Sequence, residues 1–186
     1  MIRPVSGPVA PPDVVTVGTI ETRIGAFGAA VSPLGLGCLA LPREPPDRCE
    51  LWTRRWWPAA RIVRGGPGFA ALGGELCAYL EGRLTGFTVS VDLRGTLFQT
   101  QVWRALDEIP YGRTRSYAEV AAAIGRPRAV RAVGAANGAN PVPIVVPCHR
   151  VIGAGGGLTG YGGGLAMKRW LLVLEGVLPG ELPDHP

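Results

Sequence analysis

Little charge, few aromatic side chains and a single lysine limit what this chain of 186 residues can be. Charged residues make up 18% of the sequence and aromatic residues 7%, while 47% is hydrophobic, which is typical of a globular protein and excludes a disordered one. No apolar run approaches the roughly 18–20 residues that span a bilayer. Residues 1–4 also lack the apolar core of a secretory signal, so we expect a cytoplasmic protein with no membrane partner.

Cysteine is scarce as well, and its spacing argues against two kinds of site. The four cysteines include no close CxxC pair, which argues against a compact zinc site and offers no disulfide framework: Cys38, Cys49, Cys77 and Cys148. The sequence therefore predicts a reducing environment, no metal and no cofactor.

Basic charge is distributed unevenly along the chain. Residues 1–93 carry 9 basic and 8 acidic side chains, whereas residues 94–186 carry 10 and 6. The formal net charge of +5 therefore lies mostly on the C-terminal half, where it favours a partner with a phosphate backbone. A basic balance alone is weak evidence, because many basic proteins bind no nucleic acid.

We interpret residues 1–93 as an N-terminal α/β domain, with a small antiparallel sheet and a helix, that supports the rest of the chain. Alternating apolar residues predict three short antiparallel strands, over 14–19, 24–31 and 34–41. Nothing in this half carries identifiable chemistry.

Helical patterns follow later in the same half. Apolar residues recur at intervals of three and four over 68–81, which predicts a helix that ends at Gly82. The segment 51–57, with three tryptophans, predicts a short amphipathic element, and residues 87–93 alternate like a strand or a linker. Residues 1–12 are rich in proline and are expected to fray.

We interpret residues 94–186 as a mainly α-helical C-terminal domain. Thr96-Leu97-Phe98-Gln99 and Ser116-Tyr117-Ala118-Glu119 both have the form of a capping box. They predict two helices, which end near Pro110 and Ile124.

A third helix is predicted over 128–137, with Pro127 in its first turn. The second and third helices are joined by a short turn that contains glycine, which is the form of a helix-turn-helix. One face of the third helix consists of small residues: Ala129, Ala132, Gly134, Ala135, Ala136 and Gly138. Glycine within a helix costs about 0.5–1 kcal/mol relative to alanine, so this face predicts a close approach, either by another helix or by DNA.

The segment 141–151 places Cys148 beside His149 and Arg150. Its three prolines favour an extended, stiff backbone. A thiolate needs a nearby base or positive charge near neutral pH, and His149 and Arg150 offer both. The alternative is a buried structural cysteine on a core strand, where neighbouring side chains point to opposite faces.

The surrounding sequence favours the reactive cysteine. Pro-Cys-His-Arg-Val is preceded by Asn140-Pro141-Val142-Pro143-Ile144 and followed by Leu158-Thr159-Gly160-Tyr161-Gly162-Gly163-Gly164-Leu165. These motifs resemble the signature of the O6-alkylguanine-DNA alkyltransferases, over a region from about Thr96 to Gly176. That family repairs DNA by moving an alkyl group from guanine to its own cysteine, and residues 1–93 match it only loosely.

The resemblance implies the catalytic roles. Cys148 would be the nucleophile, His149 its base through a water, and Glu175 the residue that orients His149. Asn140 would brace the turn before the catalytic segment, and Tyr117 would donate a hydrogen bond or a proton to the leaving guanine. The alternatives are an exposed glutamate, an ordinary Asn-Pro turn and a tyrosine that only packs. Lys168 and Arg169 are expected to be solvated helix charges, although the family often has a lysine at the position of Lys168.

The resemblance also implies the binding residues and the course of the reaction. The guanine pocket would be formed by Val151, Tyr161, Gly162, Gly163 and Pro143. Double-stranded DNA would be bound through its minor groove by the small-residue helix and its flanking arginines: Arg126, Arg128, Ala129, Arg131, Ala132, Gly134 and Ala135. The target base would leave the duplex, with Arg131 filling its place. The protein would act once, as a monomer consumed by its reaction, with cooperativity on DNA left open.

Three other functions are compatible with parts of the sequence. A cysteine hydrolase would use the same cysteine and histidine with turnover, an alkyltransferase-like protein would bind alkylated DNA but lack the cysteine, and a helix-turn-helix regulator would ignore alkylation. Gly155, Gly157 and Gly160 also fit the dinucleotide fingerprint GxGxxG, but a lone match without a strand–helix context is weak.

Overall fold

The computed structural model describes residues 12–66 and 68–186, and the chain divides into two compact units. Unit 1 covers Met1–Arg94 and unit 2 covers Gly95–Pro186. The expected fraying of residues 1–12 falls almost wholly outside the described residues. In the part of the chain that is described, no helix is long and apolar enough to cross a membrane.

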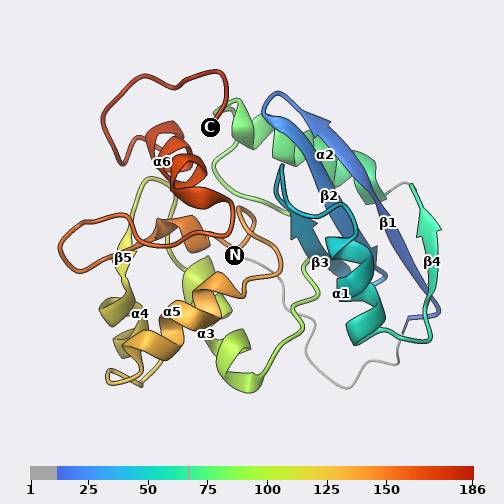
Figure 1. Cartoon of the computed structure of the whole chain (residues 1–186), viewed down its shortest axis with the longest axis horizontal. Coiled ribbons are helices and arrows are strands. Elements are labelled where there is room, and N and C mark those ends of the chain that lie inside the picture. Colours follow the sequence, from blue (N-terminus) through green and yellow to red (C-terminus); the bar gives the residue numbers. More distant parts are fainter. Residues whose placement is uncertain (1–11, 67) are drawn as a thin grey trace. The chain divides into compact units, whose positions relative to one another are not determined.

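Unit 1 is built on a four-stranded sheet with the order β3-β2-β1-β4 (Figure 1). The strands are β1 (Val14–Thr22), β2 (Gly25–Ser32), β3 (Gly35–Ala40) and β4 (Arg61–Arg64). The first three form the predicted antiparallel meander. β4, which the sequence did not predict, pairs in parallel with β1. The sheet is therefore mixed, and the expectation of a purely antiparallel sheet was wrong because β4 is too short to show an alternating pattern.

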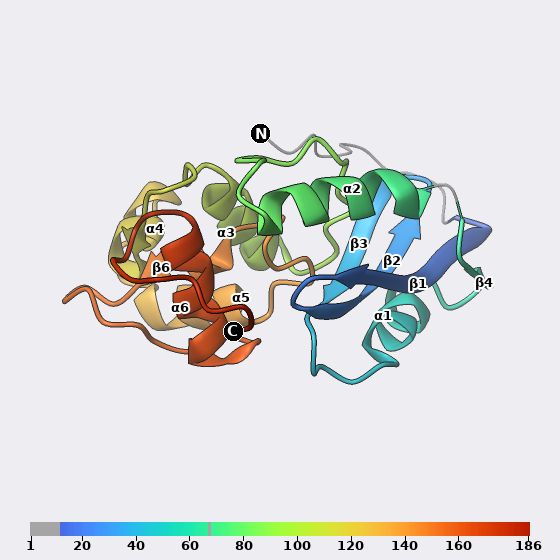
Figure 2. The same ribbon diagram turned by 90° about the horizontal axis from the view of Figure 1, so that it is seen from above.

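The helices of unit 1 cover opposite faces of this sheet (Figure 2): α1 (Arg48–Trp56) lies on one face and α2 (Gly68–Leu80) on the other. The helix predicted over 68–81 is thus confirmed, and the predicted amphipathic element is α1. A Cβ atom at Gly37 of β3 would lie 2.1 Å from the Trp52 ring, so glycine is required for α1 to pack this closely. Residues 87–93 form only one isolated bridge, at Val91.

Unit 2 is mainly helical. Its main helices are α3 (Leu97–Asp107), α4 (Tyr117–Ala123), α5 (Val130–Gly138) and α6 (Gly164–Leu174). Both predicted capping boxes are present, because Thr96 and Ser116 each accept from the third helical residue, whose side chain accepts from the cap amide in return. The Trp103 Nε1 atom donates to the Ala136 carbonyl oxygen over 2.8 Å, which fixes α3 against α5.

The third predicted helix begins later than expected. α5 starts at Val130, and its cap residue is Ala129, so Pro127 lies in the turn before the helix and not in its first turn. The turn ends with a hydrogen bond from the Ala129 amide to the Arg126 carbonyl oxygen over 2.9 Å. The buried face of α5 consists of Val133, Ala136 and Asn137.

Candidate functional site

A tight turn over residues 140–146 precedes the candidate nucleophile. The side chain of Asn140 spans this turn: its Nδ2 atom donates to the Val146 carbonyl oxygen over 2.8 Å, and its Oδ1 atom accepts from the Val142 amide over 3.1 Å. Within the turn, Ile144 is buried with a φ of 73°, a left-handed conformation that a β-branched residue rarely adopts. Asn140 therefore braces a strained backbone, which is more than an ordinary turn residue does.

Cys148 begins a single turn of 3-10 helix, η1 (Cys148–Arg150), which corrects the expectation of an extended segment. The turn is closed by a hydrogen bond from the Arg150 amide to the Pro147 carbonyl oxygen over 3.0 Å. With about three residues per turn, neighbouring side chains diverge by roughly 120° and do not point to opposite faces as on a strand. Cys148 is 4% exposed, and its carbonyl oxygen accepts from Asn137 Nδ2 over 3.3 Å.

His149, Arg150 and Glu175 form one buried cluster. His149 Nε2 lies 2.8 Å from Glu175 Oε1, and Arg150 donates to the same carboxylate from Nε and Nη2 over 2.9 to 3.1 Å. The Arg150 Nη1 atom donates to the Ile109 carbonyl oxygen over 2.6 Å, and the Gly112 amide donates to Glu175 Oε2 over 3.1 Å. Glu175 is 5% exposed, so the alternative of an exposed glutamate at the end of α6 is wrong.

Burial and charge set the protonation of this cluster. Burial raises the pKa of Glu175, but hydrogen bonds and charges from His149 and Arg150 outweigh it and hold that pKa at about 2. Burial lowers the pKa of His149 despite its bond to Glu175, so the imidazole is neutral near pH 7. The negative charge of Glu175 is therefore balanced by the Arg150 guanidinium. Because Nε2 faces the carboxylate, we assign the ring hydrogen to Nε2, which leaves the lone pair that can accept a proton on Nδ1.

Lys168 is buried within unit 2, which corrects the expectation of a solvated helix charge. It is 0% exposed, and its Nζ atom donates to the carbonyl oxygens of Val151 over 2.6 Å and Thr159 over 2.9 Å. Burial lowers the pKa of Lys168, whereas the negative charge of an ionised Cys148 raises it. The Lys168 ammonium group and an ionised Cys148 therefore stabilise each other electrostatically.

The surroundings of two charged residues were thus misread in the sequence. Arg150 was expected to supply charge to the thiol, but its guanidinium is committed to Glu175. Lys168 lies on the inward face of α6, where Met167 and Leu171 are also buried, and this helical spacing was the available signal.

Tyr117 and Val151 lie on adjoining elements. β5 (Arg115–Ser116) pairs in parallel with β6 (Val151–Ile152), and Tyr117 follows β5 as the first residue of α4. The Thr159 hydroxyl donates to the Tyr117 hydroxyl over 3.3 Å. The segment between β6 and α6 therefore reaches back to the start of α4.

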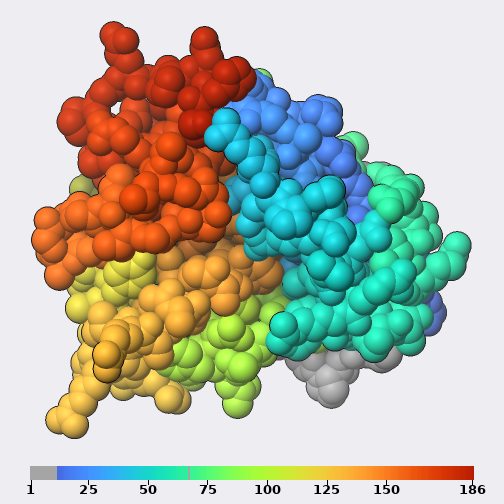
Figure 3. Space-filling model, viewed as in Figure 1, coloured from blue at the N-terminus to red at the C-terminus, as the bar shows by residue number. Residues whose placement is uncertain are grey.

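That segment holds most of the other residues expected to bind guanine. Tyr161 is half-buried, Gly162 is exposed and Gly163 is the cap residue of α6, while Pro143 is buried beside Val146 in the preceding turn. Residues 154–157 are exposed on the surface of unit 2 (orange in Figure 3). The strand before it, β6, has only two residues, and α6 begins at Gly164, after the third glycine, so the GxGxxG match does not open a helix as a dinucleotide site requires.

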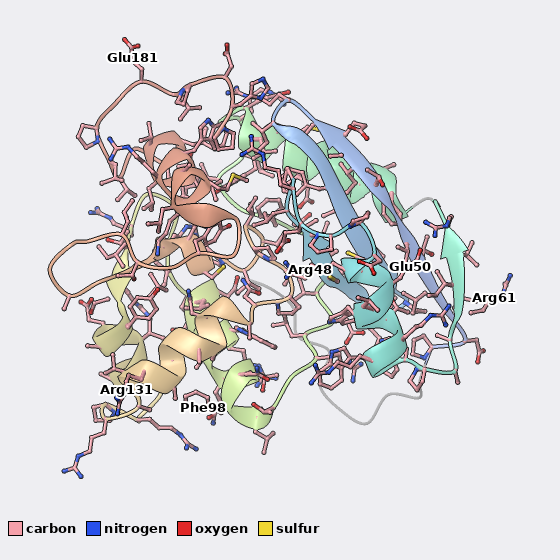
Figure 4. The ribbon with its side chains drawn as sticks, viewed as in Figure 1. Arg48, Glu50, Arg61, Phe98, Arg131 and Glu181 are labelled. Carbon is pink, nitrogen blue, oxygen red and sulfur yellow. The ribbon has the colours of Figure 1, made fainter. Side chains whose placement is uncertain are left out.

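The residues expected to contact DNA gather around the start of α5. Arg126 and Arg128 are exposed in the turn before the helix, and Arg131 is exposed in its first turn (Figure 4). Ala132 and Ala135 are exposed as well, whereas Gly134 is half-buried beside the Tyr117 ring. Close packing of another helix within unit 2 therefore accounts for Ala136, but not for the exposed Ala132 and Ala135.

Comparison with known proteins gives the family. Residues 97–177 match the family model of the 6-O-methylguanine DNA methyltransferase DNA-binding domain. A methylated-DNA–protein-cysteine methyltransferase of Mycolicibacterium paratuberculosis is 64% identical over 146 residues, which cover 77% of this chain and 88% of that protein. The chain belongs to the methylated-DNA–protein-cysteine methyltransferase family. The inducible family member of Bacillus subtilis is 50% identical over 149 residues, which cover 80% of this chain and 83% of that protein.

The fold agrees with a solved member of the family. The crystal structure of Mycobacterium tuberculosis OGT in complex with DNA superposes with a TM-score of 0.74 and 48% identity, covering 86% of this chain and 92% of that one. The similarity therefore extends into unit 1, which the sequence motifs match only loosely.

Proposed function

We propose that the chain repairs DNA by transferring an alkyl group, such as methyl, from O6 of guanine to the Sγ atom of Cys148, once per molecule. The observation that carries the proposal is the buried cluster next to Cys148, in a chain that belongs to the methylated-DNA–protein-cysteine methyltransferases. That cluster provides a neutral imidazole and an ionised carboxylate that orients it, and Lys168 adds a buried ammonium group outside the cluster.

Proton transfer from the thiol prepares the nucleophile. His149 takes the proton on Nδ1 through a water, and Glu175 stabilises the imidazolium that forms. Lys168 stabilises the thiolate electrostatically. Sγ then attacks the alkyl carbon opposite O6, so that the S–C bond forms while the C–O bond breaks. Tyr117 donates a hydrogen bond or a proton to the leaving guanine and so stabilises the negative charge that develops on it.

The target base must leave the duplex for this attack. Flipping a base costs a few kcal/mol, and the Arg131 side chain offsets part of that cost by occupying the vacated place. The helix-turn-helix of α4 and α5 binds the minor groove, where small side chains such as Ala132 and Ala135 let the helix come close. Arg126 and Arg128 hold phosphates without reading sequence. The extruded guanine enters a pocket formed by Val151, Tyr161, Gly162, Gly163 and Pro143.

The reaction ends with the alkylated protein. A thioether has no acidic proton and is a poor leaving group, so nothing in the catalytic cluster can regenerate Cys148. We assign DNA binding and transfer to residues 94–186, as one domain, and a supporting role to residues 1–93. The chain acts as a monomer on double-stranded DNA.

A repair assay tests the proposal. The protein is incubated with a duplex oligonucleotide that carries one O6-methylguanine, and the remaining lesion is quantified against unmodified guanine. We expect one lesion to be lost per chain, and none with Cys148→Ser, which should still bind the duplex. Release of methanol or continued turnover with a catalytic amount of protein would instead indicate a hydrolase, and DNA binding that is indifferent to the lesion would indicate a regulator.

A further inference from the structure

Two of the four cysteines lie side by side within unit 1. Cys38 on β3 and Cys49 on α1 are each 1% exposed, and their Sγ atoms are 3.2 Å apart. Both belong to the apolar cluster between the sheet and α1, together with Val17 and Trp52. Both are free thiols in this structure. The pair was not visible in the sequence, where ten residues and a proline-rich loop separate the two cysteines.

The pKa values of the two thiols are shifted in opposite directions. The hydrogen bond to Cys38 lowers the pKa of Cys49, and the same bond raises the pKa of Cys38, so Cys49 ionises before Cys38. The Arg48 guanidinium, which also pairs with Glu44, favours the thiolate form of both. Cys49 is therefore the more readily ionised sulfur, and it lies 3.2 Å from the Cys38 sulfur, an arrangement that favours disulfide formation.

The composition of the site favours a disulfide over a metal. Among residues 12–66 and 68–186, no group of three or more histidine, cysteine, aspartate or glutamate side chains is placed to hold a metal ion. A disulfide needs its sulfur atoms about 2.0 Å apart, so the two Sγ atoms have to approach each other by little more than an ångström.

We propose that Cys38 and Cys49 form a reversible thiol–disulfide pair that hydroperoxides oxidise, separate from the alkyl-accepting Cys148. The Cys49 thiolate attacks the peroxide oxygen and becomes a sulfenic acid, with loss of water or alcohol. The Cys38 sulfur then attacks the Cys49 sulfur and releases a second water. Two thiols lose two hydrogens and two electrons in all, and one peroxide is reduced. A dithiol reductant reverses the change.

Oxidation would close the loop between β3 and α1. The disulfide would join the helix covalently to the sheet and close a ring of about twelve residues. This ring restricts the conformations of the unfolded chain and so stabilises the fold. Because both sulfur atoms are buried, the oxidant reaches them through local opening of α1, and the reaction is expected to be slower than oxidation of an exposed thiol. The half-buried Cys77, also in unit 1, provides an internal reference.

Peptide mapping of the full chain tests the pair without DNA. The protein is treated with hydrogen peroxide and then unfolded in a denaturant that contains N-ethylmaleimide, which blocks every remaining free thiol. It is digested with trypsin without reduction. The expected product joins peptides 24–43 and 49–54, is lighter by two hydrogens than their sum, carries no maleimide, and separates again in dithiothreitol. Cys38→Ser and Cys49→Ser should each abolish it, and neither variant should yield a link to Cys77.

Two results would show that Cys38 and Cys49 are not a redox pair. If peptides 24–43 and 49–54 stay separate and carry maleimide while Cys77 is already oxidised, the pair is inert and the inference is wrong. Linkage that forms only when oxidant is added to unfolded protein would also overturn it. Neither result affects the proposed alkyl transfer, which depends on Cys148.

Discussion

Unit 1 and unit 2 both bury thiols, but they surround them differently. Cys38 and Cys49 lie in an apolar cluster and face each other, so their chemistry is that of a dithiol. Cys148 lies beside His149 in a unit that also buries Lys168, Arg150 and Glu175. The comparison separates two kinds of buried thiol. In the proposed transfer, Cys148 depends on His149 as a proton acceptor and on Lys168 as a buried cation, whereas Cys38 and Cys49 have each other as partners.

Removing the Glu175 carboxylate should have the largest effect on folding stability and on the transfer rate. Glu175→Gln leaves the buried Arg150 without its counter-charge, and breaking a buried ion pair in this way costs about 3–5 kcal/mol of folding stability. It also removes the partner that orients His149, so the transfer rate should fall. Chemical denaturation and the repair assay measure the two effects. Glu181→Gln, at an exposed position (Figure 4), is the matched control and should change neither.

The same substitution should change the acid stability. The pKa of Glu175 in the folded protein is held at about 2, below its ordinary value of 4.5. A depressed carboxyl pKa stabilises the fold above pH 4.5, and that stability is lost as the pH falls toward 2. Glu175→Gln should therefore flatten the decline in unfolding free energy within this window. A decline as steep as in the unmodified chain would contradict the assignment.

Lys168→Met tests the cation near Cys148. The methionine keeps the length of the side chain but leaves the Val151 and Thr159 carbonyl oxygens without their donor, which costs about 1–3 kcal/mol of stability. Loss of the positive charge should also make the thiolate harder to form, so the transfer rate should fall about tenfold near neutral pH and partly recover as the pH rises. A lower rate with an unchanged pH profile would mean that Lys168 acts only on packing.

Arg131→Ala separates base flipping from chemistry. Extrusion of the base costs a few kcal/mol, so losing the side chain that offsets it should slow repair of a duplex by about tenfold. Reaction with free O6-benzylguanine needs no extrusion and should stay nearly unchanged. Arg128→Ala is the control, because it should weaken DNA binding without a specific effect on extrusion. Equal losses on duplex and free base with Arg131→Ala would reject its role.

The smallest effect is expected at a helix cap. Ser116→Ala removes the acceptor for the Glu119 amide at the start of α4, which should cost about 1 kcal/mol of stability. Ser116→Thr keeps the hydroxyl and should retain most of it. Thermal unfolding of the two variants measures the difference, and equal losses would mean that the cap is not the cause.

Local sequence patterns predicted much of this fold, and tertiary placement explains what they missed. The capping boxes at Thr96 and Ser116 and the helix α2 follow from short-range rules, and all three are present. β4 has only four residues and pairs with a distant strand, so no local pattern indicated it. Pro127 fitted the first turn of a helix but lies in the preceding turn, since a proline suits both.

The candidate site shows the same division. The adjacency of Cys148 and His149 is visible in the sequence, and the family resemblance added Glu175, which the structure places against His149. The groups that Arg150 and Lys168 contact could not be predicted from adjacency in the sequence. Arg150 was expected near the thiol and Lys168 in solvent. Helical spacing could have placed Lys168 on the inward face of α6, but it does not show which groups a buried cation will contact.

Peptide mapping after repair reveals which sulfur atom accepts the alkyl group. The protein is incubated with an excess of duplex that carries O6-methylguanine, and every cysteine-containing tryptic peptide is weighed. We expect one methyl group on peptide 132–150, at Cys148, with no further gain as substrate is added and none on Cys38, Cys49 or Cys77. Methylation of another cysteine, or repair of more than one guanine per chain, would mean that Cys148 is not a single-use alkyl acceptor.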